Sequence, residues 1–221
     1  VLRTPAFDLD NNKTITNATI EINSKGAAVI KRQTTYIGPQ HDYYRYLSNS
    51  FSNEEVEREF REMTNLPAFK INTLEIKNSD KSPQSVVDFD ISVLRYSSKA
   101  GKRIFVPLNK LTAFETIPKK LERRIHPIHV KKQFKEEDTF TFAIPGDYKI
   151  ESIPDEEILL ESEFGKYKIK IEVKENILVY SRLLEIYNVE LPADRYDDLR
   201  DFYKEIVKAD GMKMVLVKKK A

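Results

Sequence analysis

The sequence predicts a mainly β protein: an antiparallel β-sandwich in two β-rich halves, with two or three short helices. Three observations support this fold class. Apolar and polar residues alternate with a period of two along many short segments, which places the apolar set on one face of a strand. Turn-forming residues separate these segments. Apolar residues at helical spacing are confined to a few stretches.

The first half, residues 1–112, contains the clearest alternation. Val87, Phe89 and Ile91 alternate with Asp88 and Asp90, as expected for a strand with one buried face. The preceding strands are expected to be joined by a hairpin turn of four residues, Asn23-Ser24-Lys25-Gly26. Further strands are expected around Ile20 and Ile22, and over 27–37, 71–77 and 103–107.

The second half, residues 136–221, repeats this pattern. Strands are expected over 138–144, 148–152, 158–161, 166–173, 177–187 and 212–217. Residues 113–135 are charged, contain two prolines and lack a clear period, so we expect them to link the two halves. Periodicity does not show which strands pair, and a sheet that runs across both halves stays open.

Two helices are expected between these strands, and a third over residues 42–47. Ser52 and Glu55 form a capping box, in which each side chain satisfies a backbone amide of the other residue, before a helix over 53–65. A second helix over 193–209 follows Pro192 and is stopped by Gly211.

Composition excludes several classes of function. The 37 basic and 35 acidic residues leave a net charge of +2, which gives no field that favours nucleic acid. No apolar run approaches the roughly 20 residues needed to span a bilayer. Without cysteine, there is no disulfide, thiolate metal site or cysteine nucleophile. Because the chain begins at Val1 rather than methionine, we expect a piece of a longer protein or a processed end.

Histidines offer little catalytic chemistry. A metal bound by His126 and His129 needs a third ligand such as Glu122, and Pro127 disfavours a helical arrangement of the pair. His41 stands beside Asp42, but no serine lies in a nucleophile-elbow pattern. We expect these histidines to be solvated or structural.

Paired carboxylates are plentiful but lack the surroundings of a catalytic acid. Asp88 and Asp90 share one strand face, and residues 155–157 are a run of three acids, yet no apolar platform accompanies either group. Asp8, Asp10 and Asn12 alternate as in a calcium loop, without the glycine and distal glutamate of an EF-hand. We therefore expect no catalytic residues, no metal and no cofactor.

Tyrosines provide the best candidate for a binding site. Tyr43, Tyr44 and Tyr46 cluster next to His41, Asp42 and Arg45. Exposed tyrosines among polar groups stack on sugars or anchor protein partners. The alternative is that these rings seal the edge of the sandwich.

The order of motifs along the chain resembles a known bacterial region. The motifs are RTP (3–5), NATIEINSKG (17–26), TTYIG (34–38), GKRIFV (101–106), DTF (138–140), IPGDYKIESIP (144–154), SEFGKY (162–167), YDDL (196–199) and VLVKK (215–219). Together they resemble the region of unknown function that follows the catalytic core in extracytoplasmic transglutaminase-like proteins of Gram-negative bacteria. Each motif is structural, so the resemblance supplies no site residues.

This resemblance implies a non-catalytic accessory β region that supports an upstream transglutaminase-like domain of the same chain, or mediates contact with a protein or substrate. It implies a location in the cell envelope, in the periplasm or at the cell surface. A carbohydrate- or peptide-binding module that uses the three tyrosines is the alternative, with a protein or glycan ligand.

Overall fold

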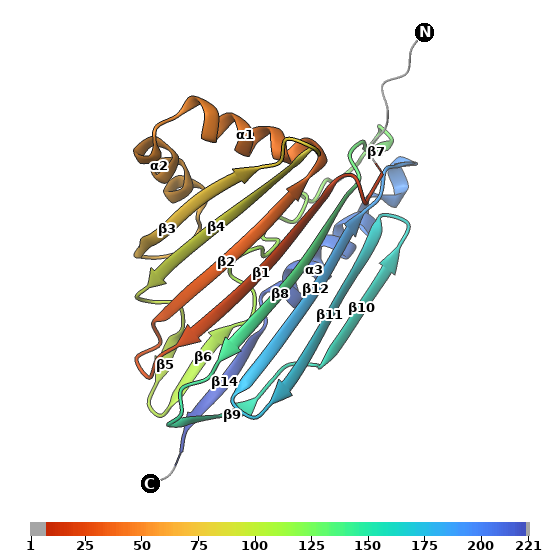
Figure 1. Cartoon of the computed structure of the whole chain (residues 1–221). Coiled ribbons are helices and arrows are strands. Elements are labelled where there is room, and N and C mark those ends of the chain that lie inside the picture. Colours follow the sequence, from red (N-terminus) through yellow and green to blue (C-terminus); the bar gives the residue numbers. More distant parts are fainter. Residues whose placement is uncertain (1–7, 220–221) are drawn as a thin grey trace.

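The computed structural model describes residues 8–219 and confirms a mainly β fold. In the described residues, strands form one large sheet, one small sheet and a two-stranded pair, and the three helices lie at the end or on one side of the large sheet (Figure 1). The motif Arg3-Thr4-Pro5 lies outside the described residues. Across residues 8–219, no helix is long and apolar enough to cross a membrane.

The large sheet contains eight strands within the described part of the chain. In spatial order they are β10 (Glu157–Ser162), β11 (Gly165–Lys174), β12 (Ile177–Ile186), β8 (Phe134–Ala143), β1 (Lys13–Ile22), β2 (Ala28–Ile37), β4 (Gln84–Val93) and β3 (Phe69–Asn78). The hairpin turn between β1 and β2 closes with a hydrogen bond from Gly26 N to Asn23 O of 2.9 Å, as the sequence predicts.

Both halves of the sequence contribute to this sheet. Strand β1 of the first half pairs with β8 of the second half, so the halves share one sheet instead of forming two. This pair is parallel and the other pairs of the sheet are antiparallel, which makes the sheet mixed. A parallel pair needs a long connection, and more than a hundred residues separate β1 from β8.

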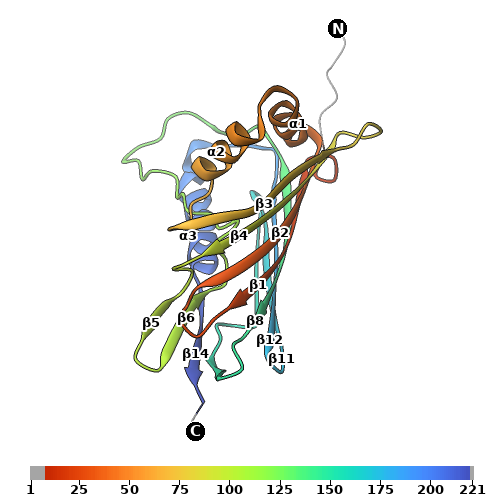
Figure 2. The same ribbon diagram turned by 60° about the vertical axis from the view of Figure 1, so that its left-hand side comes forward.

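The small sheet supplies a second layer (Figure 2). Its strands, in spatial order, are β5 (Ser98–Ala100), β6 (Arg103–Pro107), β14 (Lys213–Lys218) and β9 (Tyr148–Ser152). A short pair of β7 (Ile128–Val130) and β13 (Val189–Leu191) lies apart from both sheets. The strands β5, β7 and β13 have three residues each, too few for an alternation in sequence to reveal them.

The predicted helices are confirmed. Helix α2 (Asn53–Met63) begins with the capping box of Ser52 and Glu55, and α3 (Tyr196–Asp210) ends at Gly211. Helix α1 (His41–Ser50) packs on β3 and β4. Figures 1 and 2 show α1 and α2 together at one end of the large sheet, while α3 lies on the same side of the large sheet as the small sheet and leads into β14.

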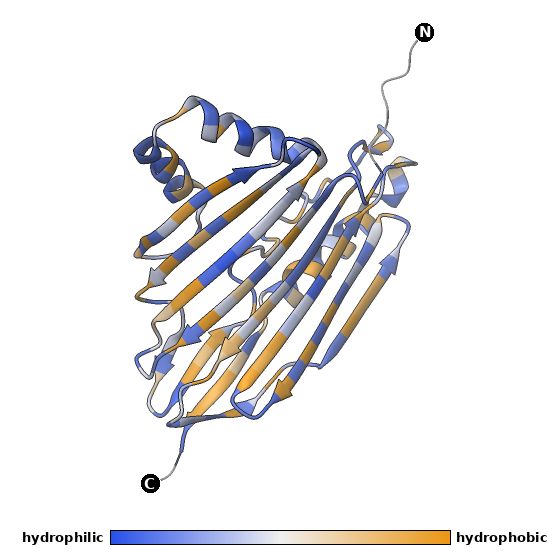
Figure 3. Ribbon diagram, in the orientation of Figure 1, coloured by the Kyte–Doolittle hydropathy of each residue, from blue (hydrophilic) through white to orange (hydrophobic). Residues whose placement is uncertain are grey.

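The core lies between the two layers. Alternation along the strands places Ile30, Phe89 and Phe140 on the inner face of the large sheet, and Ile104 and Leu216 of the small sheet belong to the same buried cluster. Figure 3 shows the alternation as hydrophilic and hydrophobic bands along each strand. Burial of these side chains at roughly 25 cal/mol per Å² is the main force that joins the layers.

Residues 108–127, which we call the strap, cross from the small sheet to β7 without regular structure. Leu108 N donates to Met212 O at 3.0 Å at one end. Further along, Tyr196 OH donates to Lys119 O at 2.8 Å, and Arg200 Nε to Pro118 O at 2.9 Å. The strap falls mostly within the predicted linker 113–135, but it is fastened to α3 and packs against the sheets.

Candidate functional site

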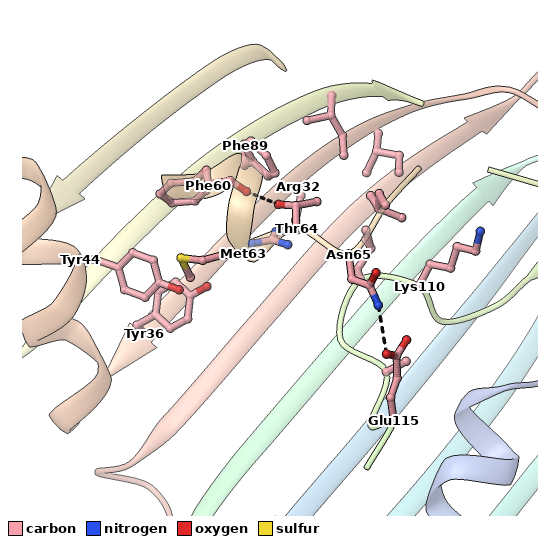
Figure 4. Close-up of a pocket in the computed structure, with 15 residues that line it drawn as sticks. Arg32, Tyr36, Tyr44, Phe60, Met63, Thr64, Asn65, Phe89, Lys110 and Glu115 are labelled. Carbon is pink, nitrogen blue, oxygen red and sulfur yellow. Dashed lines mark hydrogen bonds between the residues drawn. The ribbon is translucent and has the colours of Figure 1, made fainter. Parts of the chain in front are cut away.

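A cavity of about 290 Å³, the α2 pocket, lies where helix α2, the large sheet and the strap meet (Figure 4). Its lining comes from the inner faces of β2 and β4, from α1 and α2, and from strap residues 110–115. Along β2 and β4, every second side chain points to the inner face of the sheet, on which α2 lies. The capping box determines the residue at which α2 begins.

Aromatic rings form the closed side of the α2 pocket. Tyr44 stacks on Tyr36, with ring centroids 3.8 Å apart and an interplanar angle of 20°. Phe60 of α2 contacts Phe89 of β4 with centroids 5.2 Å apart. Burial raises the pKa of Tyr44 far above its usual value, so its hydroxyl stays neutral. The wall is therefore rigid and apolar, with neutral hydroxyl groups at one edge.

Arg32 is one of two cations that line the α2 pocket; the other, Lys110, belongs to the strap. The Arg32 guanidinium lies 5.4 Å from the centroid of the Phe89 ring. Its Nε is buried and has no hydrogen-bond acceptor among residues 8–219. No carboxylate oxygen of these residues lies within 4.0 Å of the guanidinium nitrogens. A buried donor without a partner is costly, by about 1–3 kcal/mol. This guanidinium is therefore suited to bind an oxygen atom that enters the pocket.

The strap forms the open side of the α2 pocket. Lys110 and Glu115 lie at this rim, where Glu115 accepts a hydrogen bond of 3.0 Å from Asn65 Nδ2. Met63, on the last turn of α2, also lines the pocket and is 48% exposed. The pocket thus opens between an exposed thioether and the backbone of an irregular segment, and both adapt in shape more easily than a sheet.

A buried ion cluster fixes the strap and α3 to the large sheet. Arg182 of β12 lies at the centre, with Nη1 2.8 Å from Asp138 Oδ2 and Nε 3.0 Å from Asp210 Oδ1. Its side chain is fully buried. Asp210 is the last residue of α3, so this contact joins the helix end to the middle of the sheet.

The same cluster binds the strap directly. Asp210 Oδ2 accepts Phe114 N at 2.8 Å, and Asp210 Oδ1 accepts Asn109 Nδ2 at 3.0 Å. Thr112 Oγ1 donates to Asp138 Oδ2 at 2.8 Å. These bonds hold residues 109–114, which form the rim of the α2 pocket. Burial raises the pKa of Asp138 to about 6, against the opposing effect of Arg182.

The three tyrosines predicted to bind a ligand lie in different surroundings. Tyr44 is buried and lines the α2 pocket. Tyr43 is exposed and donates to Glu59 Oε1 at 2.6 Å, and burial together with this carboxylate raises its pKa to about 12. Tyr46 is exposed and meets Phe51 edge-on. Only Tyr44 faces the pocket, and a binding role for the three rings stays a prediction.

The histidines are not brought together. His41 is buried and its Nδ1 lies 2.7 Å from Gly38 O. His129 Nδ1 lies 3.6 Å from Glu190 Oε2 on the neighbouring strand, while His126 is exposed in the strap. Among the described residues, no three His, Asp or Glu side chains are grouped as metal ligands.

The candidate carboxylate pairs serve as structural contacts. Asp88 accepts hydrogen bonds from Gln33 Nε2 and Lys77 Nζ, which lower its pKa despite partial burial. A lowered pKa is the reverse of what a general acid requires. Glu157 pairs with Lys168 at 2.7 Å, and Asp8 Oδ1 accepts Asn11 N in a local turn.

No sequence motif marks Arg32, Asp138 and Arg182. Their positions in the alternating pattern nevertheless indicate that their side chains point toward the interior. Each occupies an inward position of an alternating strand, in a row of buried apolar residues. Arg182, for example, lies between Tyr180 and Leu184 on the buried face of β12. A charged residue in such a row indicates a buried ionic contact or a site.

Comparison with known proteins places this chain in a class of β-rich domains of unknown function. Residues 102–216 match the family DUF3858, described as a "Domain of Unknown Function with solved-structure structure". The match covers more than half of the chain, and the chain belongs to this family. No curated protein sequence matches it.

One solved structure with a match is that of "a putative protease from Parabacteroides distasonis". The two chains are 19% identical, and the match covers 45% of this chain and 19% of that chain, with a TM-score of 0.38. The chain therefore spans about a fifth of that protein's length, and the likeness is too distant to carry an argument about fold or activity.

Proposed function

We propose that this chain is a non-catalytic accessory module that binds a protein segment in its α2 pocket. In the parent protein it supports an upstream transglutaminase-like domain, as the resemblance of its motifs implies. The observation that carries the proposal is Arg32, which lines the α2 pocket beside aromatic rings and whose buried Nε has no acceptor among residues 8–219. A backbone carbonyl or a carboxylate from a partner segment binds this guanidinium.

The shape of the α2 pocket favours a protein segment. At about 290 Å³ it accommodates one side chain or a chain end. Aromatic walls supply apolar contact area, and the Arg32 guanidinium beside Phe89 fixes the orientation of a polar group. The strap rim is held by the ion cluster, so the entrance is preorganised before the partner arrives.

The first test is the coding sequence that precedes Val1. The proposal expects a domain with Cys, His and Asp in the order of a transglutaminase-like core, preceded by an export signal that leads to the cell envelope. The isolated chain is expected to show neither peptidase nor transamidase activity. An activity of this chain that a single substitution abolishes would contradict the non-catalytic role.

The second test is calorimetric titration of this chain with the separately produced upstream domain. Arg32→Met keeps the apolar volume and removes the donors, so binding should weaken by at least about tenfold. Arg58→Met, on the exposed side of α2, is the matched control and should leave binding unchanged. Equal affinities of the Arg32→Met variant and the original chain would show that the α2 pocket is not the contact.

A further inference from the structure

A second cavity shares the strap residues Lys110, Ala113 and Glu115 with the α2 pocket. We call this cavity, of about 700 Å³, the basic cleft. It is lined by residues 95–97 between β4 and β5, by β5 and β6, by the strap, and by the end of α3 with the start of β14.

The floor of the basic cleft is apolar and firmly placed. Tyr96 is buried, and its hydroxyl donates to Pro107 O at 3.2 Å. Phe114 of the strap stacks on Tyr203 of α3, with centroids 5.1 Å apart. Phe105 and Val207 complete the lining and are half-buried. This surface provides rings against which a second apolar group can pack.

Cations surround this floor. Arg95, Lys99, Lys110 and Lys213 line the cleft. Within the described residues, no carboxylate lies within 4.0 Å of the charged groups of Arg95, Lys110 or Lys213. Burial and the neighbouring Lys213 both lower the pKa of Lys110. Lys99 Nζ donates to the Ser24 carbonyl oxygen at 3.0 Å and lies 5.9 Å from the centroid of the Tyr148 ring.

The two carboxylates of the lining do not neutralise these cations. Asp210 is engaged by Arg182 and by Phe114 N. Glu115 accepts its hydrogen bond from Asn65, on the side of the α2 pocket. In a chain with 37 basic and 35 acidic residues, an uncompensated group of cations around an apolar floor is a local feature and not a consequence of net charge.

We propose that the basic cleft binds an acidic segment of a partner protein, in which carboxylate side chains flank an aromatic or aliphatic residue. The carboxylates pair with Arg95, Lys110 and Lys213, and the apolar residue packs on the half-buried side chains of Phe105 and Phe114. The choice of a protein segment rests on the proposed function as a protein-binding module. The acidic character rests on the charge of the cleft alone.

An NMR titration of the whole ¹⁵N-labelled chain tests this assignment. The probe is the capped peptide Ac-AEFELA-amide, and its matched control is Ac-AQFQLA-amide. We expect saturable shifts at residues 95–99, 109–115 and 211–213 with the acidic peptide. We expect binding at least about tenfold weaker with the glutamine peptide, and weaker binding of the acidic peptide at high salt.

The double variant Arg95→Gln/Lys213→Gln should bind the acidic peptide about tenfold more weakly, because both side chains are exposed cations of the cleft. Lys70→Gln/Lys81→Gln, on exposed positions of β3 and its following turn, is the control and should bind normally. Unfolding midpoints of both variants establish that they fold.

Two results would overturn the proposal: equal binding of the two peptides, or undiminished binding by the Arg95→Gln/Lys213→Gln variant. Arg95 and Lys213 do not line the α2 pocket. If the acidic peptide does not bind, the binding of the upstream domain at Arg32 can still be tested. If the upstream domain does not bind at Arg32, the peptide titration still tests the basic cleft.

Discussion

Arg182 Nε on β12 lies 3.0 Å from Asp210 Oδ1 at the end of α3, and both side chains are fully buried. This contact joins two elements that come from different layers of the fold. Because Asp210 also accepts hydrogen bonds from Asn109 and Phe114, the same carboxylate positions the strap. The geometry of both cavities therefore depends on one ionic contact in the interior.

Arg182→Met should destabilise the protein by about 3–5 kcal/mol, because it leaves Asp138 and Asp210 buried without their cation. The free energy of unfolding in urea measures this loss. Arg103→Met is the matched control, since Arg103 pairs with Glu151 at an exposed site. An exposed pair contributes less than about 1 kcal/mol. Similar losses for the two variants would contradict the assigned role of Arg182.

Asp138 should make stability depend on pH. Burial raises its pKa to about 6 in the folded chain, above its usual value of 3.8, so folding favours the protonated carboxyl. Its contribution to stability is therefore full below pH 4 and is lost as the pH rises through 6. The two pKa values correspond to a loss of about 3 kcal/mol.

Asp138→Asn should remove this dependence, because the amide does not titrate. Urea unfolding of both proteins between pH 4 and pH 8 measures it. The stability of the original chain relative to the variant should fall as the pH rises from about 4 to about 6, and then level off. A constant difference across this range would show that Asp138 has an ordinary pKa.

Gly38 should tolerate no side chain. It has a φ of +79°, and a Cβ atom at this position would lie 1.8 Å from the carbonyl oxygen of Asn11. Gly38→Ala should cost about 3 kcal/mol or more and shift α1, which carries Tyr44. Gly101→Ala is the control: its φ is +58°, nothing lies within 4 Å, and the cost should be about 1 kcal/mol. Equal unfolding midpoints would contradict this reading.

Much of the fold is predictable from local patterns. The alternation around Phe89 and the capping box at Ser52 each specify an element through residues close in sequence, and both are confirmed. The pairing of β1 with β8 depends on contacts between distant residues, such as Ala18 opposite Phe140, which periodicity does not contain. The sequence predicts that residues 113–135 link the two halves and leaves open whether one sheet runs across both; in the structure, both halves contribute strands to both sheets.

The candidate site was less predictable for the same reason. The cluster of Tyr43, Tyr44 and Tyr46 in the sequence predicts a binding site that includes Tyr44. In the helix, Tyr44 points toward the core, while Tyr43 and Tyr46 are exposed. No residue near Arg32 in the sequence indicates a site. Arg32 becomes part of a pocket because Phe89 and α2, which lie far along the chain, pack beside it. Sites assembled from several elements become visible only when the elements are packed.

Amide hydrogen exchange of the parent protein, compared with that of this chain alone, tests the central claim most directly. If the α2 pocket holds a segment of the parent protein, amides of residues 58–66 and 108–115 should exchange more slowly in the parent. The amides of the exposed residues 80–82, in the β3–β4 turn, should exchange equally in both. Unchanged exchange around the α2 pocket in the parent protein would contradict the account.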